Sequence, residues 1–446
     1  MSNILFRDAV REGNSVVAEA YSVQSINLFK NGEDEPLDIK GLVQRISIIE
    51  DIDKPFIEVN LLVVDASNRL EDLRLNGNEK VEINIERGDP DVGDFSFHAL
   101  DDLRIAEISG LTQQDVKNRG YSIRCISDWM YINASKALVR PFEGTIGKVV
   151  DEICRTDLGL GNRDEIYISE SSKGIVNGVF THQRPIQAIN WLMRNAFEDK
   201  SPFFFFATTG FSSTPNRLNF VSLKELIDDV EDEPYHTYDF KPLDNPVGPE
   251  DGFEVGKYKI NGIGGKPSSL FGQLHDIQKG AYASTLETLD IARKNYVRKT
   301  FKYDKSNLLN EHKPFSDEHK IKDQKYDELK DSRTHFVSLN TKAFEQGNYH
   351  QPLDQTILPA ISSLITLNAN EFQILVPGNH GLHPSQIIEL NISKTGVSEG
   401  DKTPGEGVDE YLSGRYLVTR VESIYKENFK QKVTVKRNSV GVNIDA

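Results

Sequence analysis

The chain has 446 residues, and its 52 basic and 68 acidic side chains give it a formal net charge of −16. No run approaches the roughly 20 apolar residues of a membrane-spanning helix, and the N-terminus lacks the regions of a secretory signal. Two cysteines, Cys125 and Cys154, are too few for a disulfide framework or a four-cysteine zinc site. The excess of acidic residues argues against a protein that binds nucleic acid sequence-specifically, because such proteins use clustered Lys and Arg to contact the phosphates. We expect a soluble protein of about two to four domains with reduced thiols.

Residues 1–135 predict β-strands and turns. Ile57, Val59, Leu61 and Val63 fall on one face of an extended chain, as the two-residue period of a half-buried strand requires. Short strands joined by polar turns and without a long helix favour a small barrel or sandwich. The predicted strands are 57–63, 81–86, 103–109 and 121–127.

The periodicity then changes to that of helices. Thr145 is placed to cap a helix over 146–153, and Pro185 suits the first turn of a second helix that runs to Ala196. The four phenylalanines 203–206 predict a buried core strand, although they could also form a docking surface. With a further strand at 218–221, this region predicts helices packed on a short sheet, an α/β insert.

Acidic residues and prolines mark a boundary at 226–242. Leu286, Leu289, Ala292 and Tyr296 recur at helical spacing and predict a helix over about 285–297. The segment 299–335 is rich in charge and poor in apolar residues, so we expect a solvated excursion or an inserted arm. Alternation returns near the C-terminus, with predicted strands at 372–376, 388–393, 415–425 and 431–437.

The two β regions resemble each other. In the first region an alternating strand leads to VEINIE, then LRIAEIS and YSIRCIS; in the second, FQILV leads to IELNIS, then GRYLVTRVESIY and QKVTVKR. The order of elements is the same, which predicts one β-barrel module used twice around the insert. Because any two β segments share a two-residue period, chance similarity is the alternative. A duplicated module lets a trimer present six quasi-equivalent units around one axis.

Several segments resemble the baseplate hub proteins of contractile-tailed bacteriophages (myoviruses). The helix RPIQAINWLMRNAF precedes the aromatic strand SPFFFFATT and then RLNFVSLKEL, and a second β domain follows this insert. The C-terminal segments VPGNHGLHPSQIIELNIS and SGRYLVTRVESIYKENFKQKVTVKRNSVG resemble the hub ending, whose last hairpin carries Arg437, Asn438 and Ser439. The resemblance covers about residues 22–441 and extends to the torus part of type VI secretion spike proteins.

The resemblance implies a mainly β fold with an α/β insert, in which two similar tube-like β-barrel domains form a pseudo-hexameric torus in a homotrimer. Its implied partners are the six-fold tail tube protein, the three-fold central spike protein as a separate chain, the tape measure protein, baseplate wedge proteins and passing DNA. The expected parts are an N-terminal arm (1–17), a first tube-like β-barrel domain (18–138), an α/β insert domain (139–235), a mixed segment contributing to the second half (236–298), a charged arm or insertion (299–358) and a second tube-like β-barrel domain (359–446).

Motifs that could carry chemistry fail in detail. Residues 262–267 lack the spacing of a phosphate-binding loop and predict a turn. His380 and His383 lack the helix and glutamate of a metalloprotease, so we expect a surface loop between strands. Cys125 lies on an alternating strand, which favours a small buried side chain over a nucleophile. We therefore expect no catalytic, cofactor-binding or metal-binding residues.

The function expected from the sequence is a non-enzymatic structural component of the virion, the trimeric hub of a tail baseplate, assembled in the host cytoplasm. Part of the negative charge is expected to face the channel and repel phosphates. Two alternatives remain open at this stage: a tail-associated peptidoglycan hydrolase whose catalytic part is the insert, and a carbohydrate-binding tail adaptor.

Overall fold

The chain was analysed as a computed structural model that carries side chains. It describes residues 21–442 except 31–34, 67–73, 78, 89–94, 114–117, 162–164, 170–174, 197, 199, 211–215, 229–233, 241–259, 265–271, 292–293, 304, 306–307, 314, 317–318, 340–352, 369 and 395–407. The expected N-terminal arm, 1–17, lies outside these residues. No helix in the described part of the chain is long and apolar enough to cross a membrane.

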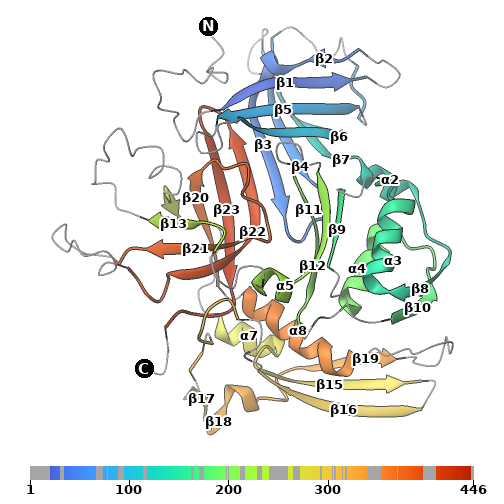
Figure 1. Cartoon of the computed structure of the whole chain (residues 1–446), viewed down its shortest axis with the longest axis vertical. Helices are drawn as coiled ribbons and strands as arrows, with labels where there is room; N and C mark the ends of the chain where they lie inside the picture. The colour runs from blue at the N-terminus through green and yellow to red at the C-terminus, as the bar shows by residue number, and fades with distance from the viewer. Residues whose placement is uncertain are drawn as a thin grey trace.

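One 13-stranded sheet runs through the molecule in the main order β14-β20-β23-β22-β3-β4-β7-β6-β5-β1-β2, and β13 joins it through β21. The sheet is curled, and its blue and red strands meet near the middle of Figure 1. Its strands are β1 (Ser22–Phe29), β2 (Leu37–Asp38), β3 (Val43–Asp51), β4 (Glu58–Asp65), β5 (Lys80–Gly88), β6 (Phe95–Gln113), β7 (Arg119–Ser127), β13 (Thr237–Phe240), β14 (Gly262–Ile263), β20 (Asn370–Pro377), β21 (Ile387–Ile392), β22 (Gly414–Tyr425) and β23 (Phe429–Arg437).

The two β regions have the same strand order. The first region pairs as β4-β7-β6-β5 and the second as β20-β23-β22-β21, with all of these pairs antiparallel. The predicted duplication is therefore confirmed at the level of topology. Where the sequence predicts two barrels, the structure joins the strands of both modules in one curled sheet, because β22 also pairs with β3.

The α/β insert has the predicted construction. The hydroxyl of Thr145 accepts a hydrogen bond from the backbone N–H of Lys148 at 3.4 Å and caps the first helix. Residues 203–206 are all buried in a three-stranded sheet covered by α4, as predicted for a core strand. The insert contains α2 (Trp129–Ser135), β8 (Pro141–Thr145), α3 (Ile146–Glu152), the π-helical turn η2 (Ile153–Asp157), β9 (Ile166–Ile168), β10 (Ile175–Val179), α4 (Pro185–Asn195), β11 (Phe203–Thr208), β12 (Arg217–Ser222) and α5 (Leu223–Asp228).

The helix predicted over 285–297 is wrong. Residues of that segment form the antiparallel hairpin of β15 and β16, and β19 adds in parallel to form a small three-stranded sheet beside α8 at the bottom of Figure 1. The apolar residues recur at a spacing that fits a helix, but backbone pairing with a distant strand decides the conformation. The parts here are α7 (Gln273–Lys279), β15 (Ala283–Asp290), β16 (Asn295–Lys302), β17 (Lys320–Ile321), β18 (Gln324–Lys325), η4 (Tyr326–Glu328), β19 (Thr334–Leu339) and α8 (Leu353–Leu367); the short helix η1 (Lys40–Leu42) lies in the first module.

The charged segment 299–335 is largely exposed over 319–335, as expected of a solvated excursion, but its first part is anchored. It contributes β16 to the small sheet, and Phe301, Leu309 and Phe315 are buried, whereas Ile321 is 45% exposed. Phe315 packs between Tyr282 and Tyr303, with ring centroids 4.4 Å and 5.1 Å away. A small number of well-placed aromatic contacts therefore fixes a segment whose composition is mostly polar.

Candidate functional site

The curled sheet has one face lined by polar side chains from both modules. Two hollows lie on it on either side of Glu422 of β22, with volumes of about 330 Å³ and 230 Å³. The first is lined by Gln373, Arg420, Glu422, Lys432 and Thr434, and the second by Arg45, Ser47, Asn60, Leu62, Ser122 and Glu422.

Basic and acidic side chains pair across the polar face. Arg124 Nε lies 3.2 Å from Glu58 Oε1, and Arg45 Nη2 lies 3.4 Å from Glu422 Oε1. Burial by itself raises the pKa of Glu58, but hydrogen bonds from Arg124 and Asn60 outweigh it and hold that pKa below its usual value. Arg124 and Arg45 are thus each neutralised by a carboxylate. Arg420 and Lys432 also line this face, so its named residues include more basic than acidic groups.

The loop of His380 and His383 joins strands β20 and β21, as predicted, but it does not lie on the surface. His380 is only 1% exposed, and its ring lies 4.9 Å from the ring of Phe429. His383 Nδ1 lies 3.0 Å from Oε1 of the buried Glu50 on β3, so it binds a strand of the other module. The loop is a junction between the modules, and the sequence prediction missed it because Glu50 is more than 300 positions away.

The same carboxylate also anchors the insert. Glu50 Oε1 accepts hydrogen bonds from the backbone N–H of Thr209 at 2.6 Å and from its hydroxyl at 3.2 Å. A second tie joins the insert to β6, where Asn216 Nδ2 donates to Asp102 Oδ1 at 2.5 Å. Thr209 and Asn216 stand at the two ends of the connection between β11 and β12, so both ends of this connection are tied to the first module.

The Arg-Asn-Ser ending fastens the last strand to neighbouring segments. Arg437 is fully buried, and it donates to the carbonyl oxygens of Tyr411 at 2.5 Å and Ser413 at 3.2 Å. Asn438 Oδ1 accepts from the backbone N–H of Leu309 at 3.0 Å, which pins the charged segment to the sheet. The motif is therefore structural in this chain.

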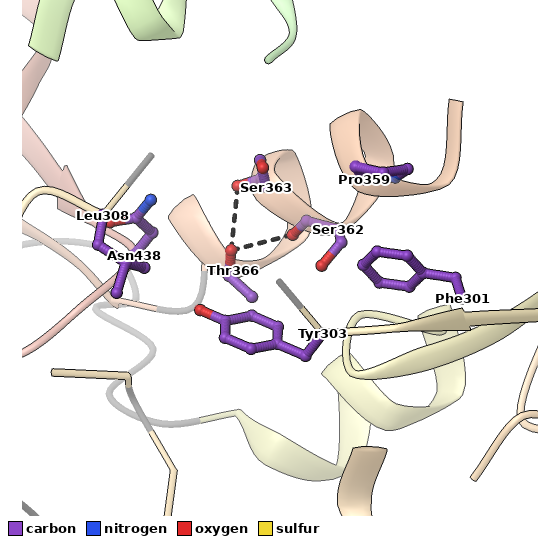
Figure 2. A pocket seen from close by; sticks show the side chains of 8 residues that line it. All are labelled: Phe301, Tyr303, Leu308, Pro359, Ser362, Ser363, Thr366 and Asn438. Carbon is purple, nitrogen blue, oxygen red and sulfur yellow. Dashed lines mark hydrogen bonds between the residues drawn. The ribbon is translucent and has the colours of Figure 1, made fainter. Parts of the chain in front are cut away.

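A small pocket lies between α8 and β16. Figure 2 shows that Thr366 turns its hydroxyl toward the carbonyl oxygens of Ser362 and Ser363, with Phe301 and Tyr303 opposite. Its volume is about 10 Å³, which is close to the minimum for a single water molecule. The cavity cannot hold a substrate.

Within the described ranges, no group of three or more His, Cys, Asp or Glu side chains could hold a metal ion. Burial raises the pKa of the Cys125 thiol to about 12 and also raises that of Cys154. Neither thiol is a nucleophile near neutral pH. The glycine segment that only partly matches a phosphate-binding loop begins as β14, which pairs with β20; its residues 265–267 lie outside the described residues.

Comparisons with solved structures identify the fold. A tail protein from Neisseria meningitidis MC58 aligns with a TM-score of 0.51 at 10% identity, covering 96% of this chain and 99% of that one. A 43 kDa tail protein of prophage MuSo2 from Shewanella oneidensis gives 0.48 at 9% identity, covering 94% and 99%. A type VI secretion component of E. coli gives 0.42 at 8% identity, covering 95% and 79%. No protein-family model and no curated protein sequence matches.

The alignment with the Neisseria protein spans nearly the whole of both chains. The resemblance drawn from the sequence is therefore confirmed at the level of the fold, which this chain shares with that tail protein. This fold contains the α/β insert and both β modules.

Proposed function

We propose that this chain is a structural protein of a contractile phage tail, the homotrimeric hub of its baseplate. In this role it adapts the six-fold tail tube to the three-fold central spike, and its channel passes the tape measure protein and then DNA. Wedge proteins would surround it. The observation that carries the proposal is that one chain contains two β modules of identical strand order, already joined edge to edge through β22 and β3.

The arithmetic of the repeat supports an adaptor. Two quasi-equivalent modules per chain become six around a three-fold axis, so one ring can meet partners of both symmetries. The shared tail-protein fold supports the same setting. If the polar face lines the channel, Glu422 and Glu58 would neutralise Arg45 and Arg124, which weakens the hold of this face on phosphates and suits passage of DNA.

The test is the mass of the native particle by light scattering, for the chain alone and mixed with its spike protein. We expect a species of three chains in at least one condition, and a stable complex with the spike. A particle that remains a single chain even with the spike contradicts the hub. The alternative function, a tail-associated peptidoglycan hydrolase, is tested separately. Clearing of peptidoglycan by the purified chain in a zymogram would identify a hydrolase.

A further inference from the structure

A lysine, an asparagine and a glutamate meet where α8 leads into the large sheet. Lys436 of β23 donates from Nζ to Oδ1 of Asn368 at 2.6 Å, and the same Nζ lies 3.3 Å from Oε2 of Glu371. Asn368 directly follows α8, and Glu371 of β20 lies opposite Lys436 in the β20–β23 ladder. The fold thus brings an amine, a carboxamide and a carboxylate into contact, although the amine and the carboxamide are 68 positions apart in the chain.

The carboxamide of Asn368 is held at both ends. Its Nδ2 donates to the main-chain carbonyl of Leu364 in the last turn of α8 at 2.8 Å, while its Oδ1 accepts from Lys436. Only this orientation gives the carbonyl of Leu364 a donor and the ammonium an acceptor. The oxygen of the carboxamide is therefore turned toward the lysine amine.

The amine lies mostly out of water. The Lys436 side chain is 14% exposed and that of Glu371 is 30% exposed. Leu417 lies opposite Lys436 on β22 and is 0% exposed. It belongs to one apolar cluster with Leu367, the residue before Asn368. The three polar groups therefore meet beside an apolar cluster, where a proton moves between neighbouring groups with little competition from water.

A second carboxyl group lies near the amine. Burial raises the pKa of the Asp53 carboxyl. The positive charge of Lys436 opposes this rise, and the carboxylates of Asp51 and Glu371 add to it. A lysine amine carries a proton near neutral pH, so it becomes a nucleophile only after a neighbouring group has taken that proton. Glu371 is the carboxylate in contact with Nζ and is placed to take it.

We propose that Lys436 and Asn368 form an isopeptide bond, a covalent amide between their side chains, and that Glu371 transfers the proton. A carbonyl bond is about 1.2 Å long, so the 2.6 Å contact with Oδ1 leaves Nζ no more than about 3.8 Å from Cγ of Asn368. Reacting atoms are in position for attack at about 3–3.5 Å. A small rotation of the lysine side chain therefore reaches this geometry.

The reaction exchanges one amide for another and needs no oxidant or cofactor. Glu371 takes one proton from the ammonium of Lys436, and the lone pair of the neutral amine attacks Cγ of Asn368. A second proton passes from Nζ to Nδ2, the bond between Cγ and Nδ2 breaks, and ammonia leaves. Ammonia then takes the proton held by Glu371 and enters water as ammonium, so the carboxylate is restored.

The bond ties the end of α8 to the last strand of the sheet. The loop that it closes contains β20, β21 and β22, so it restricts the unfolded chain of the second module in the way that a disulfide would. Ammonium diffuses away, which makes the reaction irreversible in practice. The inference does not depend on the proposed role as a hub.

Mass spectrometry of the intact, denatured full-length chain tests the bond. After days at mildly alkaline pH we expect the wild type to be lighter than its sequence by one ammonia, about 17 Da. Fragmentation of a digest should show a branched peptide that joins residues 368 and 436. The branched peptide is required, because an asparagine that cyclises onto its own backbone loses the same mass. A wild-type chain without the branched peptide overturns the proposal.

Three variants test the role of each group. Lys436→Arg keeps the charge but removes the amine, and Asn368→Ala removes the carboxamide, so both should abolish the branched peptide. Glu371→Gln removes the proton acceptor and should slow its formation at least about a hundredfold. Lys432→Arg changes an exposed lysine on the same strand and should form the bond as wild type does. A loss of ammonia that persists in Lys436→Arg overturns the bond, and formation at the wild-type rate in Glu371→Gln overturns the role of Glu371.

Discussion

Arg437 closes the last strand with a buried charge. Its guanidinium lies 4.8 Å over the ring of Tyr416 and donates to main-chain carbonyls, and burial lowers its pKa from the usual value. The charge is thus held by dipoles and a π face, with the desolvation cost offset by its hydrogen bonds.

We expect Arg437→Ala to lower the free energy of unfolding by about 3–5 kcal/mol, because buried carbonyls would lose their donor. The measurement is urea denaturation of the purified chain. Lys432→Ala on the same strand is the control, since Lys432 is exposed and should change stability by less than about 0.5 kcal/mol. Equal effects of the two substitutions would contradict a structural role for Arg437.

Asp102, half-buried where the insert meets β6, makes stability depend on pH. Burial and the nearby carboxylates of Asp128 and Asp101 raise its pKa to about 7, against a partial opposing effect of Asn216. Between pH 3.8, the value expected when unfolded, and 7, the folded state binds the proton more tightly. Its contribution to stability therefore falls as pH rises through this window and is constant above it.

We expect Asp102→Asn to remove this contribution, so that the variant gains stability relative to wild type as pH rises from 4 to 7, by about 1–2 kcal/mol. Thermal or urea unfolding at a series of pH values measures it. Asp101→Asn is the control, because Asp101 is exposed. The assignment to Asp102 would be refuted if Asp102→Asn and Asp101→Asn changed the free energy of unfolding, relative to wild type, by the same amount between pH 4 and pH 7.

At the scale of elements, the β15–β16 hairpin shows how a helical spacing can mislead. Leu286 and Leu289 are three positions apart, which puts them on one face of a helix but on opposite faces of a strand. In the structure Leu286 is 1% exposed and Leu289 is 36% exposed. The different exposure of the two leucines therefore distinguishes the strand from a helix.

We expect Leu286→Ala to cost about 2–4 kcal/mol and Leu289→Ala less than about 1 kcal/mol. Chemical denaturation of both variants measures the difference. Similar large costs at both positions would favour the helical face and contradict the hairpin.

The cap of α3 is an element that the sequence alone predicts. Thr145→Ala removes the acceptor for the N–H of Lys148 and should cost about 1 kcal/mol, while Thr145→Ser should restore most of the stability. Urea unfolding of the three proteins measures this. A serine variant as unstable as the alanine variant would show that the methyl group, not the cap, matters.

For the whole molecule, the two carboxylates that pair with arginines on the polar face predict that retention of DNA is weak. In wild type, Glu58 and Glu422 neutralise Arg124 and Arg45. We expect wild type to leave double-stranded DNA unshifted on a gel at physiological salt. Glu58→Gln combined with Glu422→Gln should retain it, with a salt dependence of about two released counterions per chain. Retention that persists after Arg45→Gln and Arg124→Gln are added would place the binding elsewhere.

The sequence by itself determined the features that depend on neighbours along the chain. Period two predicted the strands of both modules, Thr145 and Pro185 predicted helix starts, and the aromatic run predicted the core strand of the insert. The repeat was visible for the same reason, because equivalent strands keep the same alternation of buried and exposed side chains.

Only the tertiary structure decided what depends on residues far apart. The hairpin at β15 forms because β19, some 50 residues later, adds to its edge. His383 contacts a buried glutamate in the other module, and β22 joins β3 across almost the whole chain length. Strand pairing and buried charge contacts have no fixed separation along the chain, so the pattern that predicts a strand cannot say which edge will meet it.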